Sequence, residues 1–498
     1  MSAARFPLSP PIASRRKTGE ATARIVFNLT TTAMWSGPPV GIVRVESELG
    51  RWGLRHLEAL VPAFFDPGGA GFRELNRSMA DHLIAQHAAI DTLSFVSPAR
   101  KGKRKTDRIP RPLQPLAMWF LQSRRMALQT LERIRLAHPN SRAAAIADTV
   151  QRAIMSDKYR AVMVRPDGSR RARVTTDMIL GRPIEFTARD ILVCAGSGWT
   201  HDDIKLIAEA KRRTGFRFVW LCFDIIPLMF PQFYKPADVA IHRDYCHVAF
   251  PIADLVVFNS NTVAADVRAY CQANRLALGR TAVSALGADI RPAAADAPLP
   301  ASLEPGRYAL LVSTIEPRKG HRLIYQAWLK LLEAGIPQRA RFKLVFAGRI
   351  GWLVDDLIAD LRGDPRLAGT LEILTDATDD EVATLYRHAA FCLYPSQYEG
   401  FGLPVIEAFF HGKAVLASTG GAVPEVVGDL SPCLDPDDAA AWLDMLRLWI
   451  EQPDARAPYV ERIRTSFHRP TWEEAAEAFF DLVCEKGAAT NARPPEGS

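Results

Sequence analysis

The sequence predicts an α/β protein that contains two sets of parallel βαβ units. Along the 498 residues, short apolar runs alternate with stretches of helical periodicity, and several runs end in Gly, Ser or Thr before a helix. A Pro- and Ala-rich stretch without periodicity, residues 291–306, separates the two sets. The charge changes there, from 42 Lys and Arg against 26 Asp and Glu over residues 1–300 (+16) to 20 against 29 over residues 301–498 (−9). The length and the linker together favour two domains with buried cores.

The predicted strands are apolar runs that are too short for helices and that stop before a turn. They lie at 24–30, 190–197, 216–226 and 254–261 in the first half, and at 308–314, 342–348 and 414–419 in the second half. Continuous apolar runs of this kind are typical of parallel strands that helices cover on both faces. A further strand is expected to end near Pro395.

These patterns divide the chain into segments. The basic, Pro-bearing residues 1–22 and the Gly- and Pro-bearing tail 487–498 are expected to be disordered. The folded part is expected to comprise a first domain over 23–295 with a basic insertion near 98–136, a second domain over 296–470, and a last helix over 471–486. Thr471 followed by Glu474 is a capping-box pattern, which predicts the start of that helix.

The basic insertion predicts contact with an anionic partner. Residues 98–112 form a basic run with proline, which we expect as a solvated loop, and residues 113–136 place apolar side chains at helical spacing beside four arginines. Such a helix suits an anionic membrane surface, and an ordinary surface loop and domain helix are the alternatives. No nucleic-acid recognition module accompanies the charge, so nucleic acid is not an expected partner.

Secretion, membrane spanning and metal binding are not predicted. The N-terminus lacks a continuous apolar signal segment, and no stretch of about 18 uncharged apolar residues occurs. The seven cysteines form no C-x-x-C pair, which argues against a disulfide framework or a structural zinc site. Asp435 and Asp437 form a D-x-D string, which we interpret as the N-terminal cap of the helix that follows. We therefore expect a cytoplasmic protein without a metal.

A glycine-rich turn near residue 400 is the strongest functional signal. Gly400 and Gly402 let the backbone approach a ligand closely, and the N–H groups of the helix that starts near Pro404 favour an anion. Glu399 lies before the turn and Glu407 lies about one helical turn beyond it, so both can border one pocket. Carboxylates are tolerated beside an anion site where ligand hydroxyls donate hydrogen bonds to them. A sugar and a ribose supply such hydroxyls.

A second signal opens the second half. Arg318 and Lys319 follow the predicted strand at 308–314, at the edge where open α/β sheets bind ligands. Arginine offers planar forked donors and lysine offers a point charge, and together they suit a diphosphate. A solvated charge pair is the alternative interpretation when these two residues are taken alone.

These motifs resemble the family 4 retaining glycosyltransferases, whose GT-B fold has two Rossmann-like domains facing a cleft. Glu399 and Glu407 match the E-x7-E signature of that family, and residues 316–321 (EPRKGH) are similar to its diphosphate-binding segment. The similar flanking segments are 346–352, 378–396 and 424–429 in the second half and, with thinner resemblance, 37–46, 223–234 and 253–267 in the first half. The resemblance also implies that the last helix crosses back to the first domain.

The resemblance implies a role for each matching residue. Lys319 and Arg318 would bind the donor diphosphate, and Glu407 would bind the ribose. Glu399 would orient the transferred sugar together with the backbone amides of the glycine turn, by electrostatic and positional catalysis. The implied catalytic residues are Glu399, Lys319, Arg318 and Asp224. The implied donor-binding residues are Glu407, Gly400, Phe401, Gly402, Leu403, Ser313, Gly348 and Gly41.

Two positions depart from the pattern of the family. Phe223 stands where many relatives have a histidine before the aspartate of an H-D-x-x-P-L segment, although Asp224 keeps the carboxylate. Ser313 stands where some relatives have an arginine, which leaves Arg318 and Lys319 as the main phosphate cations. Asp224 also has a purely structural interpretation, as a residue that caps a loop.

The resemblance therefore implies a metal-independent retaining hexosyltransferase with a nucleotide diphosphate sugar as donor substrate and no resident cofactor. The expected donor is GDP-mannose first and a UDP-sugar second. The expected acceptor is a glycan or a polyprenyl-diphosphate-linked glycan in bacterial surface polysaccharide synthesis, with the protein peripheral at the inner face of the cytoplasmic membrane. A GT-B nucleotide-sugar epimerase and a non-catalytic sugar-nucleotide-binding relative are the alternatives. The intact Glu399 and Glu407 pair counts against both.

Overall fold

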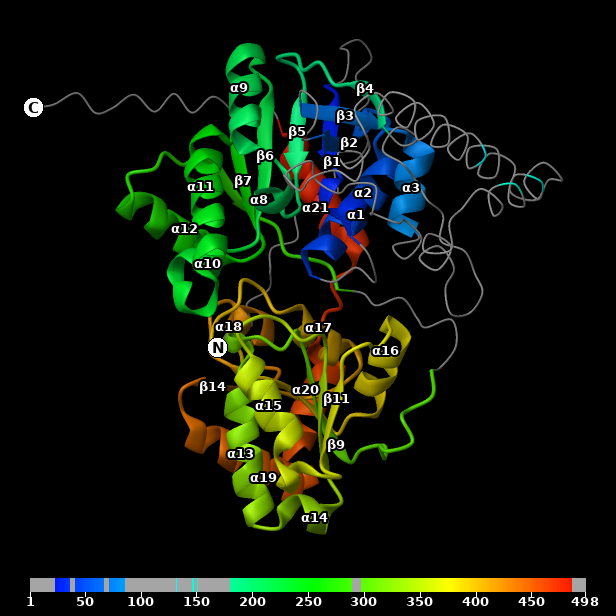
Figure 1. Ribbon diagram of the computed structural model, residues 1–498, viewed down its shortest axis with the longest axis vertical. Helices are drawn as coiled ribbons and strands as arrows, with labels where there is room; N and C mark the ends of the chain where they lie inside the picture. Colours follow the sequence, from blue (N-terminus) through cyan, green and yellow to red (C-terminus); the bar gives the residue numbers. More distant parts are fainter. Residues whose placement is uncertain are drawn as a thin grey trace, which may run out of the picture.

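The computed structural model describes residues 23–35, 41–66, 71–85, 180–288 and 297–485, and the single positions 131, 146 and 150. These residues form two α/β domains, which lie one above the other in Figure 1. The predicted fold class is confirmed. Both predicted disordered ends, and the basic insertion apart from position 131, lie outside the described residues.

The first domain is built on an eight-stranded sheet with the order β4-β3-β2-β1-β5-β6-β7-β8. Its strands are β1 (Ile25–Asn28), β2 (Leu60–Asp66), β3 (Gly71–Leu75), β4 (Leu180–Pro183), β5 (Ile191–Cys194), β6 (Arg217–Cys222), β7 (Leu255–Phe258) and β8 (Arg280–Val283). All pairs are parallel except those of β3, which is antiparallel to both neighbours. The strand order reverses between β1 and β5, and open α/β sheets bind ligands beyond the carboxyl ends of the strands at such a point.

Helices cover both faces of this sheet (Figure 1). They are α1 (Thr30–Met34), α2 (Ile42–His56), α3 (Arg77–Ala85), α8 (Gly198–His201), α9 (Ile204–Thr214), α10 (Ile226–Met229), η4 (Pro231–Phe233), α11 (Pro236–Ile252) and α12 (Asn261–Ala273). One apolar cluster joins the sheet to α2 and α3, and a second joins it to α9, α11 and α12. Burial on both faces explains why β5 and β7 consist of continuous apolar residues.

The second domain has a six-stranded sheet, entirely parallel, with the order β11-β10-β9-β12-β13-β14. Its strands are β9 (Tyr308–Val312), β10 (Lys343–Ala347), β11 (Leu371–Leu374), β12 (Phe391–Tyr394), β13 (Val415–Ser418) and β14 (Cys433–Leu434). Its helices are η5 (Pro317–Lys319), α13 (His321–Glu333), α14 (Ile336–Ala340), α15 (Asp355–Gly363), η6 (Pro365–Leu367), α16 (Asp379–His388), α17 (Leu403–Phe410), α18 (Val423–Val427), α19 (Ala439–Glu451), η7 (Pro453–Arg456) and α20 (Ala457–Ser466).

The last helix, α21 (Trp472–Cys484), returns to the first domain, where it lies among the N-terminal elements in Figure 1. The side chains of Thr471 and Glu474 form the predicted capping box. Phe480 packs into the same cluster as Phe27 of β1, with ring centroids 5.9 Å apart. A Cβ on Gly53 of α2 would lie 3.0 Å from the Phe480 ring, so glycine permits this close packing. The implied crossing helix is confirmed.

Strand predictions differ from the structure in two respects. The run 216–226 is not one strand: β6 ends at Cys222, because the Asp224 carboxylate accepts a hydrogen bond from the Ile226 N–H at 3.0 Å and turns the chain into α10. The predictions also omit β2, β3, β4, β8, β11 and β14. Pro62 interrupts the pattern of β2, and β8 and β11 are half-buried or exposed along their length, so neither presents a continuous apolar run.

The D-x-D string belongs to a helix start, although the cap is one residue later than its last member. Asp438 accepts a hydrogen bond from the Ala441 N–H and caps α19, while Asp435 accepts one from the Asp437 N–H at 2.9 Å. In the part of the chain that the structure describes, no three His, Cys, Asp or Glu side chains group as metal ligands. Within the same ranges, no helix has both the length and the hydropathy that a bilayer crossing requires.

Candidate functional site

The glycine-rich turn joins β12 to α17 at the carboxyl edge of the second sheet. Gly402 is the N-terminal cap of α17 and has φ 126°, in the region that favours glycine, and Pro404 occupies the first turn of the helix, where its missing N–H is not needed. Phe401 and Leu403 pack against the apolar cluster of the first domain. The turn that carries the predicted donor-binding amides therefore faces the other domain.

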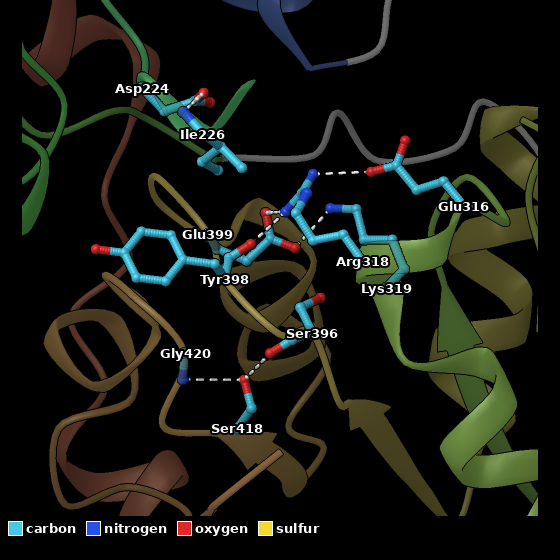
Figure 2. Close-up of polar contacts among 10 residues, drawn as sticks. All are labelled: Asp224, Ile226, Glu316, Arg318, Lys319, Ser396, Tyr398, Glu399, Ser418 and Gly420. Atoms are coloured by element: carbon cyan, nitrogen blue, oxygen red, sulfur yellow. Dashed lines mark hydrogen bonds and ion pairs between the residues drawn. The ribbon is translucent and has the colours of Figure 1, made fainter. Parts of the chain in front are cut away.

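Glu399 is buried, with 7% of its surface exposed, and two cations hold it (Figure 2). Lys319 Nζ lies 2.6 Å from one carboxylate oxygen and Arg318 Nη1 lies 2.7 Å from the other. Burial by itself would raise the pKa of Glu399, but the charges of Arg318 and Lys319 outweigh burial and lower the pKa to about 2. Glu399 is therefore an ionised carboxylate at neutral pH.

Arg318 is the more enclosed of the two cations. Besides Glu399, it donates to Glu316 Oε1 at 2.8 Å and to the backbone carbonyl of Tyr398, and Figure 2 shows it between these partners. Only 9% of its surface is exposed, and its buried Nε has no hydrogen-bond partner. This geometry suits a side chain that positions Glu399 more than one that meets a ligand with both arms of its guanidinium. Lys319 is the more accessible of the two predicted phosphate cations.

A tight backbone contact brings the two sequence motifs together. Gly320, which follows η5, has φ 72°, and a Cβ there would lie 2.1 Å from the carbonyl oxygen of Pro395. The Gln397 N–H donates to the carbonyl of Arg318 at 2.7 Å. The loop after β9 is thus attached to the loop after β12, which explains how residues 80 positions apart, Lys319 and Glu399, form an ion pair.

Glu407 lies on α17 and is engaged by two side chains. Arg44 of α2 places Nη1 3.0 Å from one oxygen, and the Tyr386 hydroxyl donates to the other at 3.1 Å. Burial raises the pKa of the Tyr394 phenol at the end of β12, and the nearby charges of Glu399 and Glu407 raise it further. The two carboxylates of the signature therefore border one region, as the sequence predicts.

Asp224 caps its own loop, as in the structural interpretation, through its hydrogen bond with the Ile226 N–H. It also lies at the glycine turn: a Cβ on Gly400 would be 2.5 Å from the carbonyl oxygen of Phe223 and 3.0 Å from the Cβ of Asp224. The absence of a side chain at Gly400 thus allows the first domain to approach the donor turn. Capping and proximity to the turn coexist at Asp224.

The remaining predicted donor-binding residues lie at two places. A Cβ on Gly348, with φ 150°, would be 2.0 Å from the carbonyl oxygen of Ser313. The residues that directly follow β9 and β10 are therefore in contact. The buried Ser313 hydroxyl has no hydrogen-bond partner. Gly41 has φ 50° and begins α2, the helix that carries Arg44. The structure therefore connects Gly41 to the site through Arg44, which pairs with Glu407.

Residues 300–466 match the family model described as glycosyl transferases group 1. These residues belong to that family. They contain both carboxylates of the signature and both predicted phosphate cations, so the family suggested by the resemblance is confirmed for this domain.

Several of the relatives that match by sequence are named as mannosyltransferases, and others as D-inositol 3-phosphate glycosyltransferases. The chain is 39% identical over 134 residues to O-antigen chain mannosyltransferase B of Escherichia coli, which covers 27% of this chain and 34% of that protein. It is 34% identical over 160 residues to a phosphatidyl-myo-inositol mannosyltransferase of Mycolicibacterium smegmatis, covering 32% and 39%. The chain thus spans about a third of the length of the first curated relatives that it matches.

A solved structure resembles the chain over both domains. The structure of Anabaena Alr3699/HepE in complex with UDP and glucose has a TM-score of 0.52 and 15% identity, and covers 93% of this chain and 99% of that one. At this identity the likeness concerns the fold, and it agrees with the predicted GT-B arrangement of two facing Rossmann-like domains.

The group 1 domain also contacts the first domain through the segments 253–267 and 424–429, whose resemblance to the family implies no role for single residues. Ser260, the N-terminal cap of α12, donates to the carbonyl of Gly400 at 2.8 Å. Glu425 of α18 accepts hydrogen bonds from the backbone N–H groups of Asn261 at 3.0 Å and Thr262 at 2.6 Å, and from both side chains. A glutamate of one domain thus caps a helix of the other. The Asn-Ser-Asn-Thr sequence after β7, residues 259–262, signals a helix start, but not a partner 163 positions away.

Replacing Glu425 by glutamine is expected to lower the free energy of unfolding by about 1–2 kcal/mol at pH 7, because the amide presents a donor to N–H groups that need an acceptor. Burial would raise the pKa of Glu425, but the hydrogen bonds from Thr262 and Asn261 outweigh it and lower the pKa. The contribution is therefore complete above pH 4.5 and is lost as the pH falls through the lowered pKa. Urea unfolding at pH 7 and pH 4 should show a smaller difference at pH 4; an equal or larger one would contradict the capping role.

Proposed function

We propose that this chain is a retaining hexosyltransferase that moves one sugar from a nucleotide diphosphate sugar to a glycan or polyprenyl-diphosphate-linked acceptor, in bacterial surface polysaccharide synthesis. The observation that carries the proposal is the arrangement of Glu399, Lys319 and Glu407 around the glycine turn of a group 1 domain. The proposal includes no metal and no resident cofactor.

Each part of the site has a task in this reaction. Lys319 neutralises charge on the diphosphate as the nucleotide leaves, and Glu407 accepts hydrogen bonds from the ribose hydroxyls. Glu399, kept ionised by Arg318 and Lys319, holds the hydroxyls of the transferred sugar and faces the positive charge that develops at its anomeric carbon. The acceptor hydroxyl attacks on the face from which the nucleotide leaves, and a phosphate oxygen takes its proton. Asp224 adds a carboxylate from the first domain beside Gly400.

GDP-mannose is the proposed donor, with a UDP-sugar as the second candidate. Support for mannose comes from the names of the relatives by sequence, which include an O-antigen chain mannosyltransferase and an inositol lipid mannosyltransferase. Support for UDP comes from the fold neighbour that was solved with UDP and glucose. Choice among hexoses depends on single hydroxyl contacts, so an assay with several nucleotide sugars is needed to decide between these two donors.

The first experiment measures nucleotide release by the purified protein with GDP-, UDP-, ADP- and dTDP-sugars, with EDTA present. Slow hydrolysis of the donor needs no acceptor. We expect release from one donor class, lost in Glu407→Ala and Lys319→Ala. Release that requires added divalent cation would contradict the metal-independent mechanism. Interconversion of the donor sugar would favour the epimerase, and binding without turnover with any acceptor would favour the non-catalytic relative.

Peripheral binding at the inner face of the cytoplasmic membrane is part of the proposal, and the basic insertion supports it. Neutralising Lys101, Lys103, Arg104 and Lys105 together should abolish co-sedimentation with vesicles that contain anionic lipid, because basic residues near a membrane surface contribute about 1 kcal/mol each. Vesicles of neutral lipid, and anionic vesicles in a buffer of high salt concentration, serve as controls. Unchanged sedimentation of the fourfold variant would reject the membrane contact and leave the transferase proposal intact.

A further inference from the structure

Arg44 is a side chain of the first domain that reaches Glu407, one of the two signature carboxylates. Its Nη1 lies 3.0 Å from Glu407 Oε1 and its Nη2 lies 3.6 Å from Asp379, at the start of α16. The side chains of Arg44 and Glu407 are 22% and 13% exposed, so solvent screens this pair less than a surface pair. The two residues are 363 positions apart.

The position of Arg44 follows from the start of α2. Gly41 turns the chain with φ 50°, and Arg44 lies in the first turn of the helix, whose N-terminal end carries partial positive charge. Ile42 packs against the same apolar cluster as Phe401 and Leu403 of the donor turn. Arg44 is therefore held beside the glycine turn by packing on one side and by Glu407 on the other.

The charges of the group 1 domain show what the site needs from its partner domain. Three carboxylates, Glu316, Glu399 and Glu407, stand against two cations, and the two cations are already paired with Glu316 and Glu399. A donor diphosphate brings further negative charge, and like charges at short range in a partly buried site repel strongly. A further cation would offset this charge, and Arg44 stands beside Glu407.

We propose that Arg44 is a donor-binding residue contributed by the first domain, which orients Glu407 for the ribose and supplies a cation to the diphosphate. A planar guanidinium has five N–H donors, so Arg44 can keep Glu407 at Nη1 while phosphate oxygens take the place of the exposed Asp379 carboxylate near Nη2. This inference rests on the proposed function, because it assumes a nucleotide diphosphate at Glu407.

Calorimetric titration with GDP, UDP, guanosine and uridine separates the two tasks. In Arg44→Ala, affinity for the diphosphate that the wild type binds should fall by at least tenfold, and affinity for the matching nucleoside should fall by less. Arg44→Lys should restore part of the diphosphate affinity, because it keeps the charge but not the fork. An equal loss for diphosphate and nucleoside, or no loss for either, would overturn the proposal.

Arg280→Ala is the matched control, since Arg280 pairs with Glu485 at 2.8 Å where the last helix meets the first domain, and it should leave both affinities unchanged. Thermal unfolding of each variant checks the fold. If the wild-type chain binds neither GDP nor UDP, the proposed function fails and this inference fails with it. If the wild type binds one of them and Arg44→Ala binds it equally well, only the role of Arg44 is rejected.

Discussion

Replacing Glu399 by glutamine is expected to lower the rate of nucleotide release by about 10²–10³-fold, because a neutral amide cannot stabilise the positive charge that develops on the transferred sugar. The nucleotide itself should bind at least as tightly as before, since Lys319 and Arg318 lose the carboxylate that now holds them at 2.6 Å and 2.7 Å. Single-turnover release and calorimetric binding of GDP and UDP measure these two effects separately.

The control for Glu399→Gln is Glu372→Gln, which removes the charge of a carboxylate paired with Lys343 at 3.1 Å on strands β10 and β11. That variant should keep the wild-type rate. A Glu399→Gln protein that releases nucleotide within threefold of the wild type would show that the sugar is held by other groups. In the wild type, a pKa of about 2 keeps Glu399 ionised, so its titration should not appear in a rate profile between pH 4 and pH 9.

Replacing Arg318 by alanine is expected to lower the free energy of unfolding by about 3–5 kcal/mol, because it leaves Glu316 and Glu399 buried without their shared cation. Arg366→Ala is the matched control. Arg366 donates to both oxygens of Asp364, yet half of its side chain is exposed, so its removal should cost much less. Urea unfolding of the two variants measures the difference; equal losses would contradict a scaffolding role for Arg318.

The pH dependence of the same cluster has a definite sign. The folded-state pKa of Glu399 lies below its ordinary value of 4.5, so its ion pairs stabilise the fold fully above pH 4.5. That contribution is lost as the pH falls from 4.5 towards 2. In Arg318→Ala, where only Lys319 still pairs with Glu399, the loss of stability over this pH range should be smaller. Titration with acid, followed by tryptophan fluorescence, compares the two proteins.

Local sequence was sufficient for the parts of the site that depend on nearby residues. Glu399 and Glu407 are fixed by one turn and one helix, and Gly402 adopts the positive φ that its position requires. The sequence also indicates the capping box at Thr471 and the loop cap at Asp224, because both use partners within three positions. Interactions between residues so close in sequence form in the same way whatever the rest of the chain does.

Contacts between the domains could not be predicted from the sequence. The partner of Glu407 is Arg44, and the partner of α12 is Glu425, and both pairs depend on how the two sheets face each other. The burial of Arg318 also depends on a distant segment. Its place after a strand is equally typical of an exposed residue, but the loop after β12 covers it. Both expected phosphate cations therefore lie against carboxylates, Arg318 against Glu316 and Glu399 and Lys319 against Glu399.

The course of α21 has a consequence for how the protein is made. The first domain is begun by β1 but its apolar cluster is completed by Phe479 and Phe480, near the other end of the described chain. During synthesis, the ribosome produces the whole group 1 domain before it produces those aromatic side chains. The second domain can therefore fold first on the growing chain, and the first domain reaches its final packing only after translation has passed α21.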